Sequence, residues 1–147
     1  MSVFSSFDIN SSGMTAQRYR MDIISENVAN ANTTRTEDGT PYVRKVVTFE
    51  QKGDQTTFSR VLNSELTSYS GQGVSVSGVY EDQSTDMSMV YDPSHPDSDE
   101  NGYVTYPNVN IVTEMTNLID ASRSYEANAT AFSASKSMAL KGLEIGQ

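Results

Sequence analysis

Apolar residues recur every seven positions near the start of the chain, with one more falling three residues after Met21. A seven-residue repeat keeps one stripe of a helix facing a partner helix. The pattern therefore predicts a helix over roughly residues 5–29. Its N-terminal seam consists of Phe7, Met14, Met21, Ile24 and Val28.

The same helix should end in the run NVANANTT, because Asn30 or Asn32 can adopt the left-handed backbone conformation that closes a helix. A polar run continues from Ser25 to Thr36. Its asparagines either form only a helix end and a turn, or they bond to neighbouring backbones and fix the register of a helix assembly. The pattern alone leaves both interpretations open.

A stronger heptad pattern occupies the last forty residues. One row of residues spaced seven apart consists of Ile111, Leu118, Tyr125, Phe132 and Ala139. A second row lies four residues further along and includes Met115, Ser122, Ala129 and Leu143. Pro107 followed by Asn108 and Asn110 is typical of a helix start. The pattern predicts a helix of about 35 residues, about 50 Å long at 1.5 Å per residue.

The central segment, residues 33–106, is rich in Ser, Thr and turn residues. Alternating runs predict strands at 42–49, 73–80 and 87–91. Residues 81–102 hold seven acidic side chains and no basic one, which indicates an extended, solvated stretch. The predicted fold is mainly α with a small β-rich insert.

Three segments follow from this division: an N-terminal coiled-coil helix, a β-rich central segment and a C-terminal coiled-coil helix, over residues 1–32, 33–106 and 107–147. Val, Ile, Leu and Phe together supply 29 of 147 residues, which is little material for a core. The two helices either pair as a hairpin over their own sheet, or complete their core against neighbouring subunits. The thin seams favour the second interpretation.

Charge and composition exclude several classes of function. A net charge of −9 argues against nucleic-acid binding, because a duplex requires clustered Lys and Arg. The absence of Cys excludes disulfides and thiolate metal sites. We expect neither a signal peptide nor a membrane span, since no suitable apolar run occurs.

Candidate chemistry is sparse. Asp97, Asp99, Asn101 and Gly102 match the first half of a Ca²⁺-binding EF-hand loop, but the position of its final Glu is Asn108. We interpret this run as an acidic turn that binds no metal. No phosphate loop, nucleophile elbow or dinucleotide fingerprint occurs, so we expect no enzyme, cofactor or small-molecule substrate.

At residues 21–36 the chain resembles the rod and hook proteins of the bacterial flagellum. Their shared motif corresponds here to Asn27, Val28, Ala29, Asn30, Asn32 and Thr33. The last helix resembles its family counterpart at Glu114-Met115, Arg123, Tyr125 to Asn128 and Lys136 to Met138. Residues 90–110 and the short length are similar to the proximal-rod type in particular. A longer turn before Pro41-Tyr42 departs from many members but is common in that type.

The resemblance implies a structural subunit of the periplasmic rod, polymerising helically through its terminal helices and transmitting torque to the hook. Implied partners are other copies, other rod proteins, a membrane-ring adaptor at the rod base and the flagellar type III export apparatus, which needs no cleaved signal. It implies that subunits touch through the N-terminal seam and through a C-terminal seam made of Met115, Leu118, Tyr125, Phe132 and Leu143. The alternative functions are a secreted helical adhesin-like or effector-like binding module and a Ca²⁺-regulated module.

Overall fold

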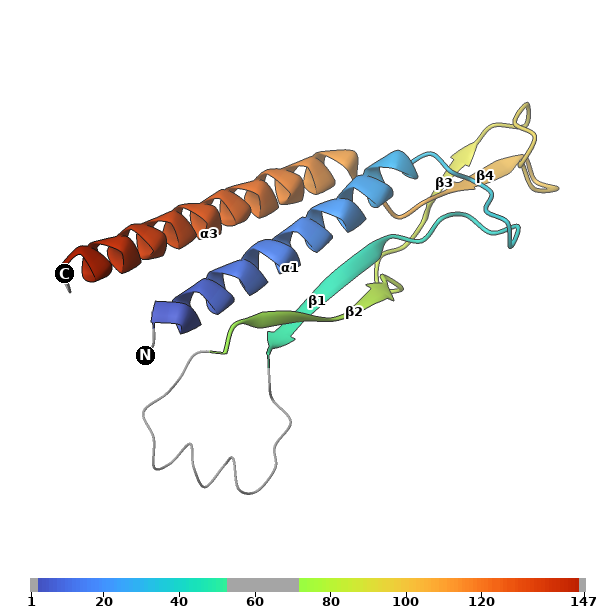
Figure 1. Ribbon diagram of the computed structural model, residues 1–147. Coiled ribbons are helices and arrows are strands. Elements are labelled where there is room, and N and C mark those ends of the chain that lie inside the picture. Colours follow the sequence, from blue (N-terminus) through green and yellow to red (C-terminus); the bar gives the residue numbers. More distant parts are fainter. Residues whose placement is uncertain (1–2, 53–71, 146–147) are drawn as a thin grey trace, which may run out of the picture. The chain divides into compact units, whose positions relative to one another are not determined.

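The computed structural model describes residues 3–52 and 72–145, so the parts of the predicted segments at 1–2, 53–71 and 146–147 lie outside the described residues. Long helices form the two ends of the chain, and two small sheets lie between them in sequence (Figure 1). The elements are α1 (Val3–Ala29), β1 (Lys45–Gln51), β2 (Val74–Glu81), β3 (Ser88–Tyr91), β4 (Tyr103–Tyr106) and α3 (Ile111–Ile145). The predicted mainly helical fold with a small β insert is confirmed at this level.

The end of α1 differs in detail from the prediction. Among the described residues only glycines have a positive φ, so neither Asn30 nor Asn32 is left-handed. The helix closes instead through a tight turn, in which the Thr33 backbone N–H donates to the Asn30 carbonyl at 3.0 Å. The Asn30 side chain donates to the Glu26 carbonyl at 2.9 Å. The Glu26 carbonyl also accepts the Asn30 backbone N–H at 3.1 Å, so these bonds close the helix without a left-handed residue.

The start of α3 is where the sequence predicts it, and the helix has the predicted 35 residues. Asn110 caps it, because its Oδ1 accepts the Thr113 backbone N–H at 3.1 Å. Asn108, the other cap candidate, is instead buried and bonds elsewhere.

The strands form two separate two-stranded sheets, β1 with β2 and β3 with β4. The three predicted strands correspond to β1, β2 and β3. The antiparallel partner of β3, β4, is missing from the prediction because its residues, YVTY, do not alternate between apolar and polar side chains. The stretch 81–102 is therefore more structured than expected, since β3 and a series of turns lie within it.

The chain divides into two compact units. Within the described residues, unit 1 combines the start of α1, residues 49–77 and the end of α3, from Ser122 onward. In this unit the Phe7 and Phe132 rings meet edge to face with centroids 5.0 Å apart. Ser12 Oγ accepts the Val74 backbone N–H at 3.1 Å and so attaches β2 to α1.

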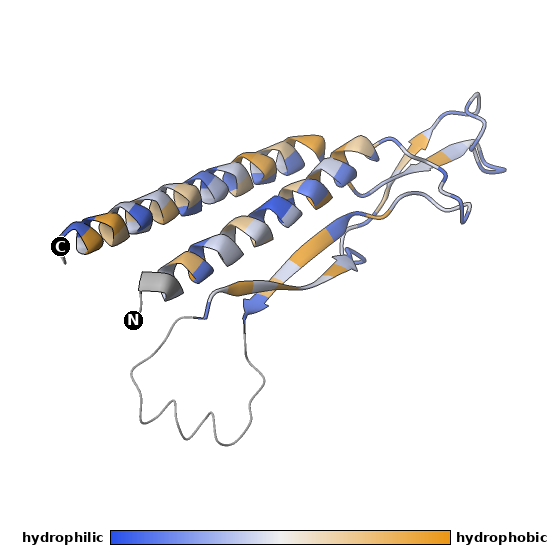
Figure 2. Cartoon of the chain, in the orientation of Figure 1, coloured by the Kyte–Doolittle hydropathy of each residue, from blue (hydrophilic) through white to orange (hydrophobic). Residues whose placement is uncertain are grey.

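Unit 2 comprises residues 19–48 and 78–121. Its apolar core is small, consisting of Ile24, Ala31, Tyr42, Val104 and Ala121. Three polar side chains, Asn27, Asn108 and Glu114, are buried beside them. Figure 2 accordingly shows apolar and polar residues mixed along both helices.

Candidate functional site

Asn27 in unit 2 joins α1 to β1 and α3. Its Nδ2 donates to the Lys45 carbonyl at 2.8 Å and to Glu114 Oε2 at 3.0 Å. Its Oδ1 accepts the Tyr42 hydroxyl and the Lys45 backbone N–H, both at 2.9 Å. The side chain is 1% exposed, so these four bonds replace its whole hydration.

Glu114 is buried to the same degree and is paired with an arginine. Arg44 donates to Glu114 Oε1 from Nε at 3.0 Å and from a terminal nitrogen at 2.8 Å. Asn117 adds a third donor to the same oxygen at 3.2 Å. The other terminal nitrogen of Arg44 reaches Asp82 at 3.2 Å. A buried carboxylate with its hydrogen bonds satisfied avoids the penalty of an unpaired charge.

Asn108 connects the same arginine to the loop after β2. Its Oδ1 accepts the Arg44 backbone N–H at 2.8 Å. Its Nδ2 donates to the carbonyls of Asp82 at 2.7 Å and Thr85 at 3.2 Å. We call this set the polar clamp; it consists of Asn27, Tyr42, Arg44, Asp82, Asn108 and Glu114.

Titration behaviour follows from these contacts. Burial, together with the charges of Glu26 and Glu114, raises the pKa of Tyr42 to about 12. Burial alone would lower the pKa of Arg44, but hydrogen bonds to Glu114 and Asp82 raise it above its usual value. Hydrogen bonds from the Ser84 hydroxyl and backbone N–H, and from Thr85, hold the pKa of Asp82 well below its usual range. Around neutral pH Arg44 and Asp82 are therefore charged, and Tyr42 is a neutral donor.

The family-motif residues occupy different environments. Asn27 is the buried centre of the clamp, while Asn30 and Thr33 form the turn, with Thr33 Oγ1 donating to Asn30 Oδ1 at 3.2 Å. Val28 is half-buried, and Ala29 and Asn32 are exposed. The motif thus combines a buried polar anchor with a helix stop.

The seam residues are mostly half-buried within the chain. In the N-terminal seam Ile24 is buried and the others are half-buried: Phe7, Met14, Met21 and Val28. In the C-terminal seam Leu118, Tyr125 and Phe132 are half-buried, but Met115 is 54% and Leu143 71% exposed. The most buried positions of α3 are instead Glu114, Ala121 and Ser135. These lie in one seven-spaced row that hydrophobicity does not mark.

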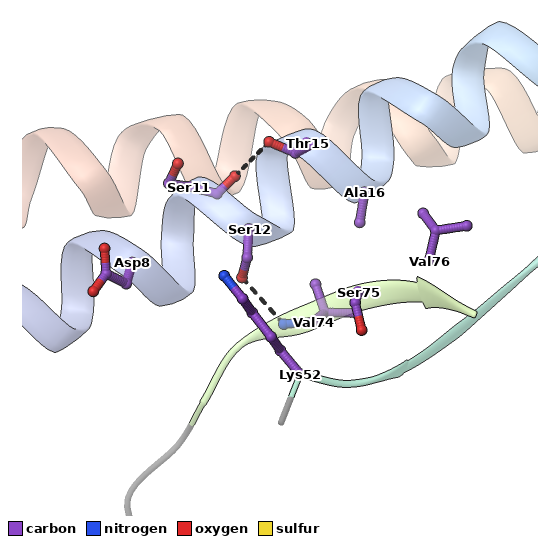
Figure 3. Close-up of a pocket in the computed structure, with 9 residues that line it drawn as sticks. All are labelled: Asp8, Ser11, Ser12, Thr15, Ala16, Lys52, Val74, Ser75 and Val76. Atoms are coloured by element: carbon purple, nitrogen blue, oxygen red, sulfur yellow. Dashed lines mark hydrogen bonds between the residues drawn. The ribbon is translucent and has the colours of Figure 1, made fainter. Parts of the chain in front are cut away.

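Unit 1 contains an open groove of about 420 Å³ between α1 and β2 (Figure 3). Two of its hydroxyls donate to backbone carbonyls of α1. Ser12 Oγ donates to the Ile9 carbonyl at 2.7 Å, and Thr15 Oγ1 donates to the Ser11 carbonyl at 3.0 Å. Figure 3 shows Lys52 extending across the groove toward α1. The groove thus lies where Ser12 attaches β2 to α1.

The acidic turn uses its carboxylates internally. Asp99 Oδ1 accepts the backbone N–H groups of Asn101 at 2.9 Å and Tyr103 at 2.8 Å. Asp97 accepts the Thr34 hydroxyl at 2.8 Å and lies 3.6 Å from Arg35. Within the described ranges, no three His, Asp or Glu side chains are grouped so that they could hold a metal ion.

Sequence reasoning missed most of the clamp. Asn27 belongs to the family motif, and Glu114 lies among the positions of the last helix that resemble the family. The sequence does not connect either residue to the rest of the clamp, which consists of Tyr42, Arg44, Asp82 and Asn108. One signal was present: Arg44 and Lys45 interrupt an otherwise apolar strand run. A charged pair in such a run indicates a buried partner or an edge strand, but not which.

Neither helix that the structure describes is long and apolar enough to cross a membrane. Exposed apolar positions such as those of α3 are typical of a surface that contacts another protein. The chain matches two family models, "Flagella basal body rod protein" over residues 7–35 and "Flagellar basal body rod FlgEFG protein C-terminal" over residues 100–145. These place it in the class of flagellar rod proteins, which are structural and not enzymes.

Relatives that match over their whole length show which kind of flagellar rod protein this chain resembles. The flagellar basal-body rod protein FlgC of Bacillus subtilis strain 168 is 46% identical, with 100% of both chains covered. FlgC of Borreliella burgdorferi is 45% identical over 100% of this chain and 99% of its own. FlgC of Escherichia coli O6:H1 is 40% identical over the whole of both chains. The chain belongs to the FlgC family of flagellar basal-body rod proteins.

Proposed function

We propose that this chain is a structural subunit of the proximal rod in the flagellar basal body, where it polymerises helically and transmits torque toward the hook. The observation that carries the proposal is the bare apolar surface of α3. Seven large apolar side chains of this helix are exposed: Ile111, Val112, Met115, Ile119, Met138, Leu140 and Leu143. A helix with this surface gains stability when neighbouring subunits cover it.

The terminal helices of this proposal pair as a coiled coil in the assembled rod. The edge-to-face contact of Phe7 with Phe132 joins the two helices within one chain. Exposed Met115 and Leu143 leave the outer side of α3 available for a neighbouring helix. Both seams would then contribute to contacts between subunits, and the N-terminal motif would fix their register through the clamp.

The same proposal assigns partners and location. The partners are other copies of the chain, other rod proteins, the membrane-ring adaptor at the rod base and the type III export apparatus. The rod lies in the periplasm, and the chain reaches it without a cleaved signal. The coiled-coil layer of the rod is formed by the terminal segments, residues 1–32 and 107–147. The central segment, residues 33–106, packs against this layer and supports it.

Two measurements on the source bacterium test this function. Mass spectrometry of detergent-resistant basal bodies should detect the chain, and a deletion strain should lack rods and be non-motile until the wild-type chain is restored. A deletion strain that swims normally, with basal bodies lacking the chain, would overturn the proposal in favour of another secreted helical assembly such as an adhesin.

A further inference from the structure

The connection between β3 and β4 contains Asn101-Gly102, the one asparagine–glycine pair of the sequence (Figure 1). An asparagine side chain is chemically least stable before glycine, because glycine has no Cβ to shield its backbone nitrogen from the neighbouring amide. Asn101 is exposed, so water reaches its side chain. The pair therefore brings together a side-chain carbonyl, a backbone nitrogen and water.

The fold requires glycine at position 102. Gly102 has a φ of +80°, a backbone conformation that L side chains rarely adopt. A Cβ there would also lie 2.9 Å from the Tyr91 ring and 3.3 Å from Pro93 Cβ. The labile pair is thus part of the turn, because a larger residue after Asn101 would be strained and would collide with Tyr91.

Hydrogen bonds restrain the reactive nitrogen in the folded chain. The Gly102 backbone N–H donates to the Asp99 carbonyl at 3.0 Å. Asp99 Oδ1 accepts the backbone N–H groups of Asn101 at 2.9 Å and Tyr103 at 2.8 Å. A bonded N–H must lose its partner before its nitrogen can attack a carbonyl. Residues 81–102 also carry seven acidic side chains and no basic one, which disfavours loss of a proton from the backbone there.

We propose that Asn101 is a deamidation site, which the turn protects in the folded chain and which reacts when the hairpin opens. The Gly102 nitrogen loses its proton and forms a bond to Asn101 Cγ. The bond from Cγ to the side-chain nitrogen breaks, and this nitrogen leaves with the proton as ammonia. Water then opens the succinimide ring at either carbonyl and gives aspartate or isoaspartate. The sum is asparagine plus water giving an acid plus ammonia, without oxidation or reduction.

The isoaspartate product does not fit the turn. Its backbone is longer by one carbon, so the residues after it lose their positions opposite β3. Two pairings are affected directly: the Asp92 backbone N–H donates to the Gly102 carbonyl at 2.9 Å, and Tyr91 lies opposite Tyr103. The new carboxylate also adds to the seven acidic side chains of the same stretch. Deamidation therefore makes an opening of the hairpin irreversible.

Peptide mapping of the purified full-length chain by mass spectrometry tests the site, and labelling by an isoaspartyl methyltransferase gives a second readout. At one temperature and slightly alkaline pH, the folded chain should be converted at Asn101 at least about tenfold more slowly than the chain in urea, because the reaction follows the open population. Asn101→Gln should remove the signal at this position, since glutamine would have to close a larger ring.

Two alanine variants separate the turn from its charge. Asp99→Ala removes the oxygen that accepts two backbone N–H groups, so it should speed conversion of the folded chain about tenfold. The matched control, Asp86→Ala, removes the same charge from the same acidic stretch at an exposed position outside the turn, and should keep the wild-type rate. In the converted chain, hydrogen exchange at the Asp92 amide should be faster than in the unconverted chain.

Three outcomes would each overturn the proposal: equal rates in the folded chain and in urea, equal rates in the two alanine variants, or another asparagine reacting ahead of Asn101. These measurements use the purified chain and do not depend on the rod function. Their failure would therefore leave that function standing, and loss of the rod function would leave the deamidation site standing.

Discussion

An amide side chain has two N–H donors and a carbonyl oxygen with two lone pairs, and the Asn27 site uses all four. Aspartate would place a second carboxylate oxygen against Glu114, and leucine would leave every partner unsatisfied. The asparagine at this position of the rod-family motif is therefore explained by its site. It is the residue that ties the end of α1 to both β1 and α3.

Asn27→Ala should destabilise the folded chain by about 3 kcal/mol or more, because several buried groups lose their only partner at about 1–3 kcal/mol each. Urea denaturation followed by circular dichroism measures the change. The control is Asn32→Ala, an exposed asparagine of the same motif, which should stay within about 0.5 kcal/mol of wild type. Equal effects at the two positions would contradict the clamp.

Tyr42 makes the clamp sensitive to alkali. Its hydroxyl donates to Asn27, and burial raises its pKa from the ordinary value of 10.0 to about 12 in the folded chain. The neutral form is therefore favoured by folding, so its contribution is complete below about pH 10 and is lost as the pH rises toward 12. Between pH 10 and pH 12 the wild type should therefore lose stability that the Tyr42→Phe variant does not lose. The difference in the lost free energy of unfolding should be about 2–3 kcal/mol.

Unfolding free energies between pH 9 and pH 12 test this at the residue scale. Tyr80→Phe, at a tyrosine that is 57% exposed, is the control and should keep the wild-type slope. A Tyr42→Phe slope that matches wild type would mean that the hydroxyl is not held by the clamp. Loss of stability in acid has a different cause. Hydrogen bonds lower the pKa of Asp82 in the folded chain, so its contribution to stability is lost only as the pH falls below the usual pKa of an aspartate.

At the scale of elements, the positions of the two helices could be predicted from the sequence. Which side of each helix is buried could be predicted only in part. Period and caps placed α1 and α3 within a few residues, because both signals are local. The inward row of α3 runs through Glu114, Ala121 and Ser135, which a hydrophobicity pattern passes over. Glu114 is buried because Arg44, 70 residues away in the sequence, pairs with it. No local pattern carries that information.

Gly73, at the start of β2, is sensitive to substitution at the scale of elements. Its φ is +86°, and a Cβ there would collide with Ser12 Oγ, the atom that attaches β2 to α1. Gly73→Ala should therefore cost about 2 kcal/mol or more, through backbone strain and loss of this attachment. Gly142→Ala is the matched control: nothing lies within 4 Å of its Cβ position in α3, so helix propensity should stabilise it by up to about 1 kcal/mol.

Thermal unfolding of both alanine variants shows whether the signs differ as expected. Hydrogen exchange of β2 amides adds a local measure, since Gly73→Ala should speed exchange at Val74, whose N–H bonds to Ser12. A destabilisation of the same size at Gly142 would indicate a general effect of alanine and not the close approach of β2 to α1.

At the scale of the whole molecule, the small size of the apolar cores could be predicted from the amino-acid composition. A chain with 29 strong apolar residues in 147 folds into two units whose apolar cores are small. Among the described residues its buried side-chain polar atoms have hydrogen-bond partners, with the exception of Gln17 Oε1. Such a chain leaves apolar helix surface uncovered. The sequence could predict this shortage, but not which surfaces remain bare, because that depends on contacts between distant segments.

Assembly should therefore be more sensitive than export to a charge on the inner side of α3. Leu118 is half-buried between the clamp residue Glu114 and the buried Ala121 along this helix. Leu118→Asp removes apolar contact area and places a carboxylate near an existing one, which costs several kcal/mol if it stays ionised. The export route proposed above carries the chain unfolded and so would not depend on that packing. We expect the Leu118→Asp variant to be secreted normally, but its strain should form no rods and should not swim.

The control is Ser133→Asp, at an exposed position of α3, whose strain should form rods and swim. Normal rods in the Leu118→Asp strain would show that the C-terminal seam does not hold the rod together.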